Sequence, residues 1–285
     1  MTTAAVQSAT SREMYQLLEP IHAMIYFAPE PQEEYAALGL EGTAEGYFPS
    51  RAAPLGRVPW QVVQATFFGF SPLAVQVGMT HAWEKTTPEA VLAARLRGVD
   101  RALRRMAGDL LDDVQEALTL VDRAASGCRP EGRPLYAAHA ALPVPPEPQL
   151  ALWHTISLLR EFRGDGHLAA LLAARVTGTQ AVVLNGAVHG PGMTTFLQKS
   201  RAWTPQVWDE AAGQLRSRGW LDDAGELTDE GRTAREAIEA QTDELALPAW
   251  EQLGQDGCDR LGELLGPMSR AIVDAGGLPV PRRRI

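Results

Sequence analysis

The sequence is poor in lysine, cysteine and long apolar runs, and each shortage excludes a class of protein. Lys85 and Lys199 are the only lysines among 26 basic residues, and 35 acidic residues give a net charge of −9. Nucleic-acid affinity rests largely on basic side chains that neutralise phosphates. The charge balance therefore argues against a general polyanion-binding protein.

The few cysteines and the N-terminal segment also indicate the cellular compartment. Cys128 and Cys258 lie far apart and in no metal-binding or redox spacing, which favours two reduced thiols. The N-terminus lacks the basic and apolar pattern of a signal peptide, and no apolar run reaches about 18 residues. We therefore expect a cytoplasmic protein with no membrane partner.

Several signatures of cofactor chemistry are missing as well. The sequence has no P-loop, dinucleotide fingerprint, Gly-x-Ser-x-Gly elbow or haem-attachment cysteine pair. Nucleotide-dependent and serine-hydrolase mechanisms are thus disfavoured, and we expect no cofactor, although non-covalently bound haem stays open. The spacing Glu161-x3-Asp165-x-His167 offers metal ligands, but no HExxH-like or cysteine frame supports it, so we expect no metal.

Apolar residues at helical spacing predict a mainly α protein. Thr87-Pro88-Glu89 has the capping hydroxyl and first-turn proline of a helix start, and the apolar stripe that follows predicts one long spine helix over 88–125. Six prolines within 129–148 predict a linker. We therefore expect an N-terminal helical domain over 1–128, a Pro-rich linker over 129–148 and a C-terminal domain over 149–285.

Residues 205–230 carry the pattern of a winged helix. A helix over 205–218 ends at Gly219, and the turn sequence 222–225 lies between Trp220-Leu221 and Glu226-Leu227, which predicts a small β-wing near 220–228. Together with the helix start at Thr228, this pattern resembles the C-terminal part of the winged helix-turn-helix of MarR-type regulators, over about 165–247. The resemblance implies a ligand-responsive transcription regulator.

The charges of this segment do not suit DNA. The predicted recognition helix carries Asp209 and Glu210, and the predicted wing carries Asp222 and Asp223. Between residues 201 and 250, five arginines face eleven acids, a net charge of −6. Phosphate would repel such a surface, so we expect that this winged helix does not contact nucleic acid.

The two halves of the chain also echo each other, which predicts a pseudo-repeat of two winged-helix-like halves joined by the spine helix. A histidine precedes a glutamate by eight residues in the first half and by seven in the second. Further matching pairs are 36–38 with 169–171, 42–43 with 178–179 and 61–62 with 206–207. The first half would be a degenerate copy, and the chain would be a monomer that imitates a regulator dimer, or a homodimer.

Residues 160–167 concentrate two arginines, two carboxylates and a histidine between apolar flanks. Interface ion pairs would explain them, but so would a site. Gly164 and Gly166 predict a break between two helices, so we expect His167 to be the first residue of the second helix. His167 would be the proton carrier, and Asp165 would orient its imidazole. Glu161 would be a second acid or base and Arg163 an oxyanion or carboxylate clamp.

The remaining candidates are assigned to ligand binding. Polar groups near aromatic side chains predict one wall of a pocket for a flat organic ligand, located between the N-terminal helices and 149–175. The residues assigned to this wall are His22, Tyr26, Glu30, Arg51, His154 and Arg160. An aromatic core with a satisfied histidine is the other interpretation.

Three hypotheses about function follow. The first is a small-molecule-binding protein on a winged-helix scaffold, a nucleotide-independent acid–base enzyme of specialised metabolism. The second is a MarR-like regulator, and the third is a carrier for haem or a chromophore. The stretches "IHAMIYFAPE", "GYFPSRAAPLG" and "LLREFRGDGH" resemble those of a family of actinobacterial helical proteins of unassigned function, which implies no residue roles.

Overall fold

The computed structural model describes residues 6–278, and nearly all of its regular structure is helical. The first part of the chain forms α1 (Ser8–Ala23), α2 (Pro29–Ala36), α3 (Thr43–Ala52), α4 (Trp60–Thr66), α5 (Pro72–Met79), α6 (Ala82–Lys85), α7 (Pro88–Ala107) and α8 (Gln115–Ala125). The second part forms α9 (Pro134–Ala140), α10 (Pro148–Ala173), α11 (Gly178–His189), α12 (Pro191–Ser200), α13 (Pro205–Ser217), α14 (Asp229–Leu253) and α15 (Gln255–Asp274). The predicted mainly α class is confirmed.

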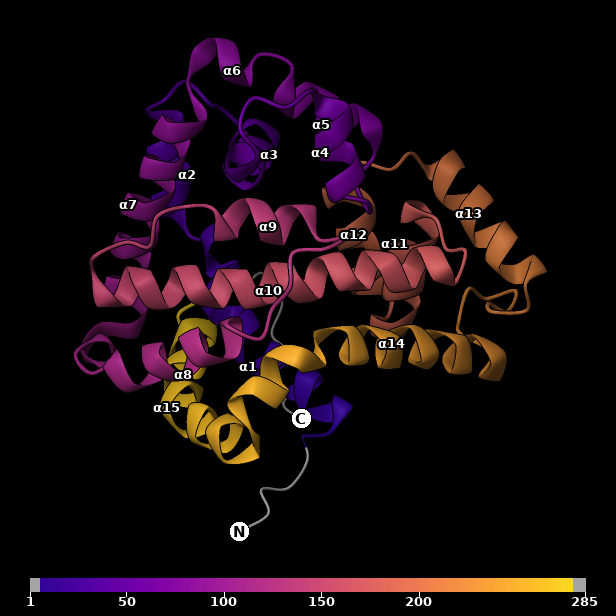
Figure 1. The fold of residues 1–285 in the computed structure, drawn as a ribbon. Helices are drawn as coiled ribbons and strands as arrows, with labels where there is room; N and C mark the ends of the chain where they lie inside the picture. The colour runs from indigo at the N-terminus through magenta and orange to yellow at the C-terminus, as the bar shows by residue number, and fades with distance from the viewer. Residues whose placement is uncertain (1–5, 279–285) are drawn as a thin grey trace.

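The central element is α10, which crosses the middle of the molecule with α3–α6 and α9 on one side and α8, α14 and α15 on the other (Figure 1). Its neighbours are α1, α7, α8, α9 and α14. It is buried around most of its circumference, as expected for a helix surrounded by other helices. Within residues 6–278, no single helix has the length and apolar composition to cross a membrane, and α10 with α11 meets both conditions only as a pair bent by 103°.

The predicted break at Gly164 and Gly166 is wrong, because both glycines lie inside α10. At Gly166 a Cβ would lie 2.8 Å from Nη1 of Arg133 and 3.2 Å from Cβ of Leu245. This glycine therefore lets Arg133 and α14 approach the helix closely. Close packing, and not chain reversal, is its structural role here.

The predicted spine helix over 88–125 is also wrong, because it is two helices. α7 begins at the predicted Thr87 cap, whose hydroxyl accepts from the backbone N–H of Ala90 at 3.2 Å. It ends before Gly108, whose φ of +51° is left-handed and ends a helix easily. A 3₁₀ turn over Gly108–Leu111 then leads to α8.

The predicted linker over 129–148 contains a helix that belongs to the core. α9 packs on α10, and its Leu135, Tyr136 and His139 are all buried. The prolines are compatible with this helix because Pro134 occupies its first turn, where no backbone N–H donor is needed. The segment therefore contributes side chains to the interior and is not a linker.

A short wing follows α13, as predicted. Leu221 and Leu227 form an isolated antiparallel bridge, and the N–H of Asp222 donates to the carbonyl of Glu226 at 2.9 Å. Gly219, with a φ of +72°, ends the preceding helical segment. α12, α13 and this wing thus form a helix–turn–helix with a small β-turn at one end of the molecule (Figure 1).

The helix packing has a reciprocal pattern between the halves. α1 of the first half packs on α15 of the second, and α10 of the second packs on α8 of the first. The packing of α3 on α5 likewise corresponds to that of α11 on α13. Both α5 and α13 begin with a capping hydroxyl residue followed by proline, at Ser71-Pro72 and Thr204-Pro205. This pattern supports the predicted duplication and the interlocking of its two copies. In this pattern the counterpart of α13 in the first half is α5. The sequence match of 61–62 with 206–207 had instead made α4 its counterpart.

Candidate functional site

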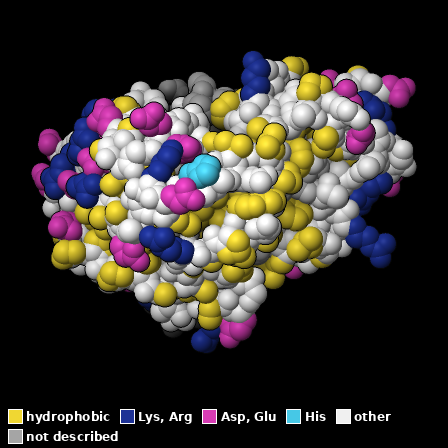
Figure 2. Space-filling model, turned by 90° about the horizontal axis from the view of Figure 1, so that it is seen from above, with side chains coloured by type: hydrophobic (Ala, Val, Ile, Leu, Met, Phe, Trp, Pro, Cys, Tyr) yellow, Lys and Arg dark blue, Asp and Glu magenta, His cyan; other side chains and the backbone are white. Residues whose placement is uncertain are grey.

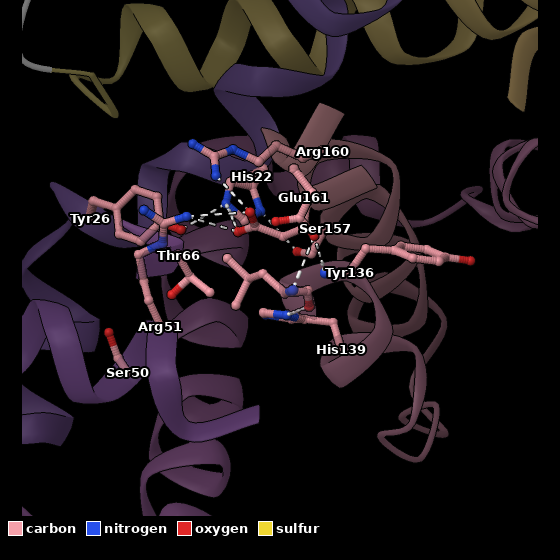
Figure 3. A network of polar contacts seen from close by, with 12 residues as sticks. His22, Tyr26, Ser50, Arg51, Thr66, Tyr136, His139, Ser157, Arg160 and Glu161 are labelled. Carbon is pink, nitrogen blue, oxygen red and sulfur yellow. Dashed lines mark hydrogen bonds and ion pairs between the residues drawn. The ribbon is translucent and has the colours of Figure 1, made fainter. Parts of the chain in front are cut away.

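Side chains from both halves converge on the carboxylate of Glu161, at the centre of α10 (Figure 3). Arg51 of α3 donates from Nη2 to both carboxylate oxygens, at 3.1 and 3.3 Å. Arg160 donates from Nη1 to Oε2 at 2.9 Å, and its Nε reaches Glu19 of α1 at 3.3 Å. Glu161 is only 2% exposed, so these contacts lie inside the protein. Such a buried carboxylate requires paired cations of this kind.

A chain of hydrogen bonds fixes the proton positions on His22, which is fully buried. Ser157 contacts the carbonyl oxygen of Trp153 at 2.8 Å and Nδ1 of His22 at 2.9 Å. The serine has one proton, and the carbonyl can only accept, so Nδ1–H of His22 must donate to Ser157. Nε2 then accepts from the hydroxyl of Tyr26 at 2.8 Å. His22 is therefore a neutral imidazole whose two nitrogens are both engaged.

The electrostatics of the cluster agree with these protonation states. Burial lowers the pKa of His22 well below its usual value, and the charge of Arg160 lowers it further. Burial alone would raise the pKa of Glu161, but Arg160 and Arg51 hold it well below the usual range. Nε2 of His22 lies 4.0 Å from Oε1 of Glu161. The site at neutral pH thus holds an ionised carboxylate beside an uncharged imidazole.

Aromatic side chains form one wall of this cluster. Tyr47 receives a hydrogen bond from Nη1 of Arg51 at 2.9 Å, and its ring lies 5.1 Å from that of Tyr26 and 5.2 Å from that of Phe70. The guanidinium of Arg51 also lies over the ring of Phe67 at 4.4 Å. Cation–π contacts of this kind hold an arginine in place without neutralising its charge.

The four residues predicted to be catalytic do not form one site. Because α10 is continuous, residues four apart share a face and residues two apart do not. Glu161 and Asp165 therefore face α3 and α9, while Arg163 and His167 face α14. The predicted acid–base set depended on a helix break that does not exist.

The individual roles predicted for three of them are also wrong. Asp165 accepts from the backbone N–H groups of Leu135 and Tyr136, at 3.0 and 2.9 Å, and so caps α9 instead of orienting His167. His167 contacts the hydroxyl of Thr242 through Nδ1 at 2.9 Å and lies inside a helix, not at its start. Arg163 is paired with Asp243 at 2.7 Å. Burial raises the pKa of Asp165 to about 6 and lowers that of His167 to about 4.

The residues predicted to bind substrate divide into two groups. His22, Tyr26, Arg51 and Arg160 all belong to the cluster around Glu161, between the N-terminal helices and α10, and their role in ligand binding stays a prediction. Glu30 lies elsewhere, in an ion pair with Arg105 on α7. His154 is buried two turns before Glu161, and burial lowers its pKa to about 4.

Sequence reasoning missed three contributors to the cluster. Ser157 precedes Glu161 by four residues and Glu19 precedes His22 by three, so both share a helix face with a residue that was identified. That spacing could have found them. Arg201, at the end of α12, approaches from the other half with its guanidinium 4.2 Å from the ring of Phe70. No local pattern could have placed Arg201 there.

The buried histidines are poorly disposed as metal or haem ligands. Both ring nitrogens of His22 are hydrogen-bonded, and those of His139 contact Arg95 at 3.1 Å and the carbonyl of Leu135 at 2.8 Å. Burial and the charge of Arg95 lower the pKa of His139 to about 3. In the part of the chain from 6 to 278, no three His, Cys, Asp or Glu side chains are grouped as metal ligands.

The fold and the cluster together define a helical protein with a helix–turn–helix and a polar site between its halves. The chain belongs to the helix-turn-helix family, whose sequence profile matches residues 11–279. Searches among curated proteins and among solved structures gave no match. This match does not show membership of the MarR-type regulators, so that finer resemblance stays a prediction.

Proposed function

We propose that the protein binds a small organic molecule at the junction of its two halves, beside Glu161. The observation that carries the proposal is the convergence of α1, α3 and α10 on one buried carboxylate, next to the aromatic wall formed by Tyr26, Tyr47 and Phe70. Polar groups that converge on aromatic surface are typical of small-molecule sites. A helix-turn-helix scaffold would thus have been retained for ligand binding.

Ligand binding at this position requires movement. The cavity nearest to the cluster is lined by α1, α10 and α14 beside Arg160, not by the aromatic wall, and has a volume of about 10 Å³. That is room for about one water molecule. The half-buried rings of Tyr26 and Tyr47 lie at the edge of the cluster, so a ligand would enter as α3 moves away from α10.

The test is a thermal-shift screen of the purified protein with aromatic acids, amides and alcohols. A ligand that binds the folded state raises Tm, and the rise grows with the logarithm of its concentration divided by Kd. We expect Tyr47→Leu to abolish the shift of each hit, because this ring links Arg51 to Phe70.

The matched control for this screen is Val77→Ala, on the exposed face of α5. The control variant should keep every shift. If Tyr47→Leu and the wild type respond alike, binding occurs elsewhere and the site is misassigned.

A DNA-binding regulator is the second candidate, and the family membership favours it. The exposed side chains of α13, the wing and α5 argue against DNA binding. Asp209 and Glu210 are exposed on α13, and Asp222 and Asp223 are exposed on the wing. α5, which packs as the counterpart of α13, exposes Leu73 and Val77 instead of basic residues. The face of the molecule that Figure 2 shows carries a broad band of apolar side chains.

We therefore expect no electrophoretic retardation of a random-sequence DNA duplex by this protein at low salt. Phosphate contacts need basic side chains, and the affinity they give weakens steeply as salt is added. The measurement is a mobility-shift titration repeated over a salt series. Retardation that disappears with increasing salt would establish the regulator and contradict this prediction.

A further inference from the structure

The polar cluster contains more positive than negative charge. The positive charges of Arg51 and Arg160 both act on Arg201, whereas the carboxylates of Glu161 and Glu19 pair with Arg51 and Arg160. Each carboxylate is already bonded to Arg160, and Glu161 also to Arg51. One positive charge is therefore left without a counter-charge. Arg160 and Arg201 are only half-buried, so an anion from solvent can reach this charge.

Arg201 is the group that lacks an acid. Among residues 6–278, no carboxylate lies within 4.0 Å of its guanidinium, whose side-chain contacts are Ser200 Oγ at 3.5 Å and the ring of Phe70. Burial lowers the pKa of Arg201, and the charges of Arg51 and Arg160 lower it further, against the opposing effect of Tyr47. Its nearest charged neighbours are thus cations.

Arg51 also has a hydrogen-bond donor without an acceptor in this cluster. Its Nη1 and Nη2 are used by Tyr47 and Glu161, but its Nε is buried and donates to no acceptor among the described residues. A buried donor without an acceptor loses its hydration with no replacement. Tyr47 contacts Arg51, Phe70 packs against Tyr47, and the guanidinium of Arg201 lies over Phe70, so the two rings form one wall beside both arginines.

We propose that the ligand is an organic anion with a flat apolar body, and this inference rests on the function proposed above. Its carboxylate binds between Arg51 and Arg201, accepting hydrogen bonds from Nε of the first and from the guanidinium of the second. Its body packs against Tyr47 and Phe70. One carboxylate thus supplies both the missing negative charge and the missing acceptor. Arginine recognises such a group well because its donors match two carboxylate oxygens.

The same anion would connect the first half to the helix–turn–helix. Arg201 is the residue that follows α12 and leads into the turn before α13. Its carbonyl already accepts from the N–H of Ser71 at 3.0 Å, and the indole of Trp203 donates to the carbonyl of Gly69 at 2.9 Å. An anion on Arg201 therefore adds a third link to this junction and fixes the position of the turn relative to α3.

The experiment is calorimetric titration of the full chain with benzoate and with benzamide, its uncharged isostere. We expect benzoate to bind at least about tenfold more tightly than benzamide, because only the acid supplies the missing charge. Arg201→Gln should remove this preference, and Arg216→Gln, which changes an exposed arginine of α13, should keep it. Arg201→Gln should not lower Tm, because the arginine has no acidic partner to leave behind.

Three results would overturn the inference, and they separate it from the proposed function. Equal affinity for benzoate and benzamide, or an unchanged preference in Arg201→Gln, would refute the anion while a ligand site remains. A lower Tm in Arg201→Gln with unchanged benzoate binding would show a structural role for this arginine. If neither probe binds and no compound of the aromatic panel shifts Tm, the proposed function fails together with the inference.

Discussion

Glu161→Gln should destabilise the protein by about 3–5 kcal/mol, the effect expected when one member of a buried ion cluster is removed. The substitution keeps the shape of the side chain but deletes its charge. Arg51 would then be left buried with no carboxylate, and Arg160 would keep only Glu19. The measurement is urea unfolding followed by circular dichroism, with the midpoint compared at an unchanged slope.

The matched control is Glu116→Gln, which breaks an equally short ion pair with Arg260 on the surface. Its two side chains are about half exposed, so water replaces the lost contact and the urea midpoint should not move measurably. A double variant, Arg51→Met with Glu161→Leu, should recover part of the lost stability because it removes both charges of one pair. If Glu161→Gln unfolds at the wild-type midpoint, the cluster is hydrated and its burial is misjudged.

Gly178→Ala should separate the two halves and cost about 3 kcal/mol, at the upper end for overpacking of a rigid interior. An added Cβ would lie 1.9 Å from the backbone carbonyl oxygen of Phe68, which no side-chain rotation can relieve. The first turn of α11 must therefore move away from the loop over 67–71. Because this loop also bonds to Arg201 and Trp203, the variant should weaken any ligand binding at the junction as well.

Gly262→Ala on α15 is the control for this substitution. It lies inside a helix, and nothing approaches its added Cβ within 4 Å. Here alanine should stabilise the protein by roughly 0.5–1 kcal/mol, because it reduces the freedom of the unfolded chain and favours the helix. Equal stability of Gly178→Ala and the wild type would mean that the halves do not touch at this point in solution.

Local signals in the sequence predicted the elements that depend on neighbouring residues. The cap at Thr87, the turn over 222–225 and the helix end at Gly219 each involve a few adjacent positions, and the structure has them as expected. The same reasoning failed at Gly166, because a glycine that permits close packing and a glycine that breaks a helix are indistinguishable along the chain. The identity of the neighbour, here Arg133, decides between them.

The site was predictable in part for the same reason. His22 and Tyr26 are four residues apart on one helix, so their shared face followed from periodicity alone. Placing Arg163 and His167 beside Glu161 required knowing whether α10 continues, and that depends on α14 and α9. Arg51 was assigned to the ligand wall from its aromatic surroundings, but its contact with Glu161, 110 residues away, could not be derived.

The sequence by itself determined that this is a mainly helical chain with an acidic helix–turn–helix and wing, because periodicity, caps and charge are properties of consecutive residues. Tertiary structure alone decided that Glu161, Arg51 and His22 share one buried cluster and that Asp165 and His167 do not. It also decided that the charges of Arg51 and Arg160 act on Arg201, whose guanidinium lies over the ring of Phe70. The physical reason is that helix faces are set locally, whereas burial and charge pairing depend on which face lies opposite.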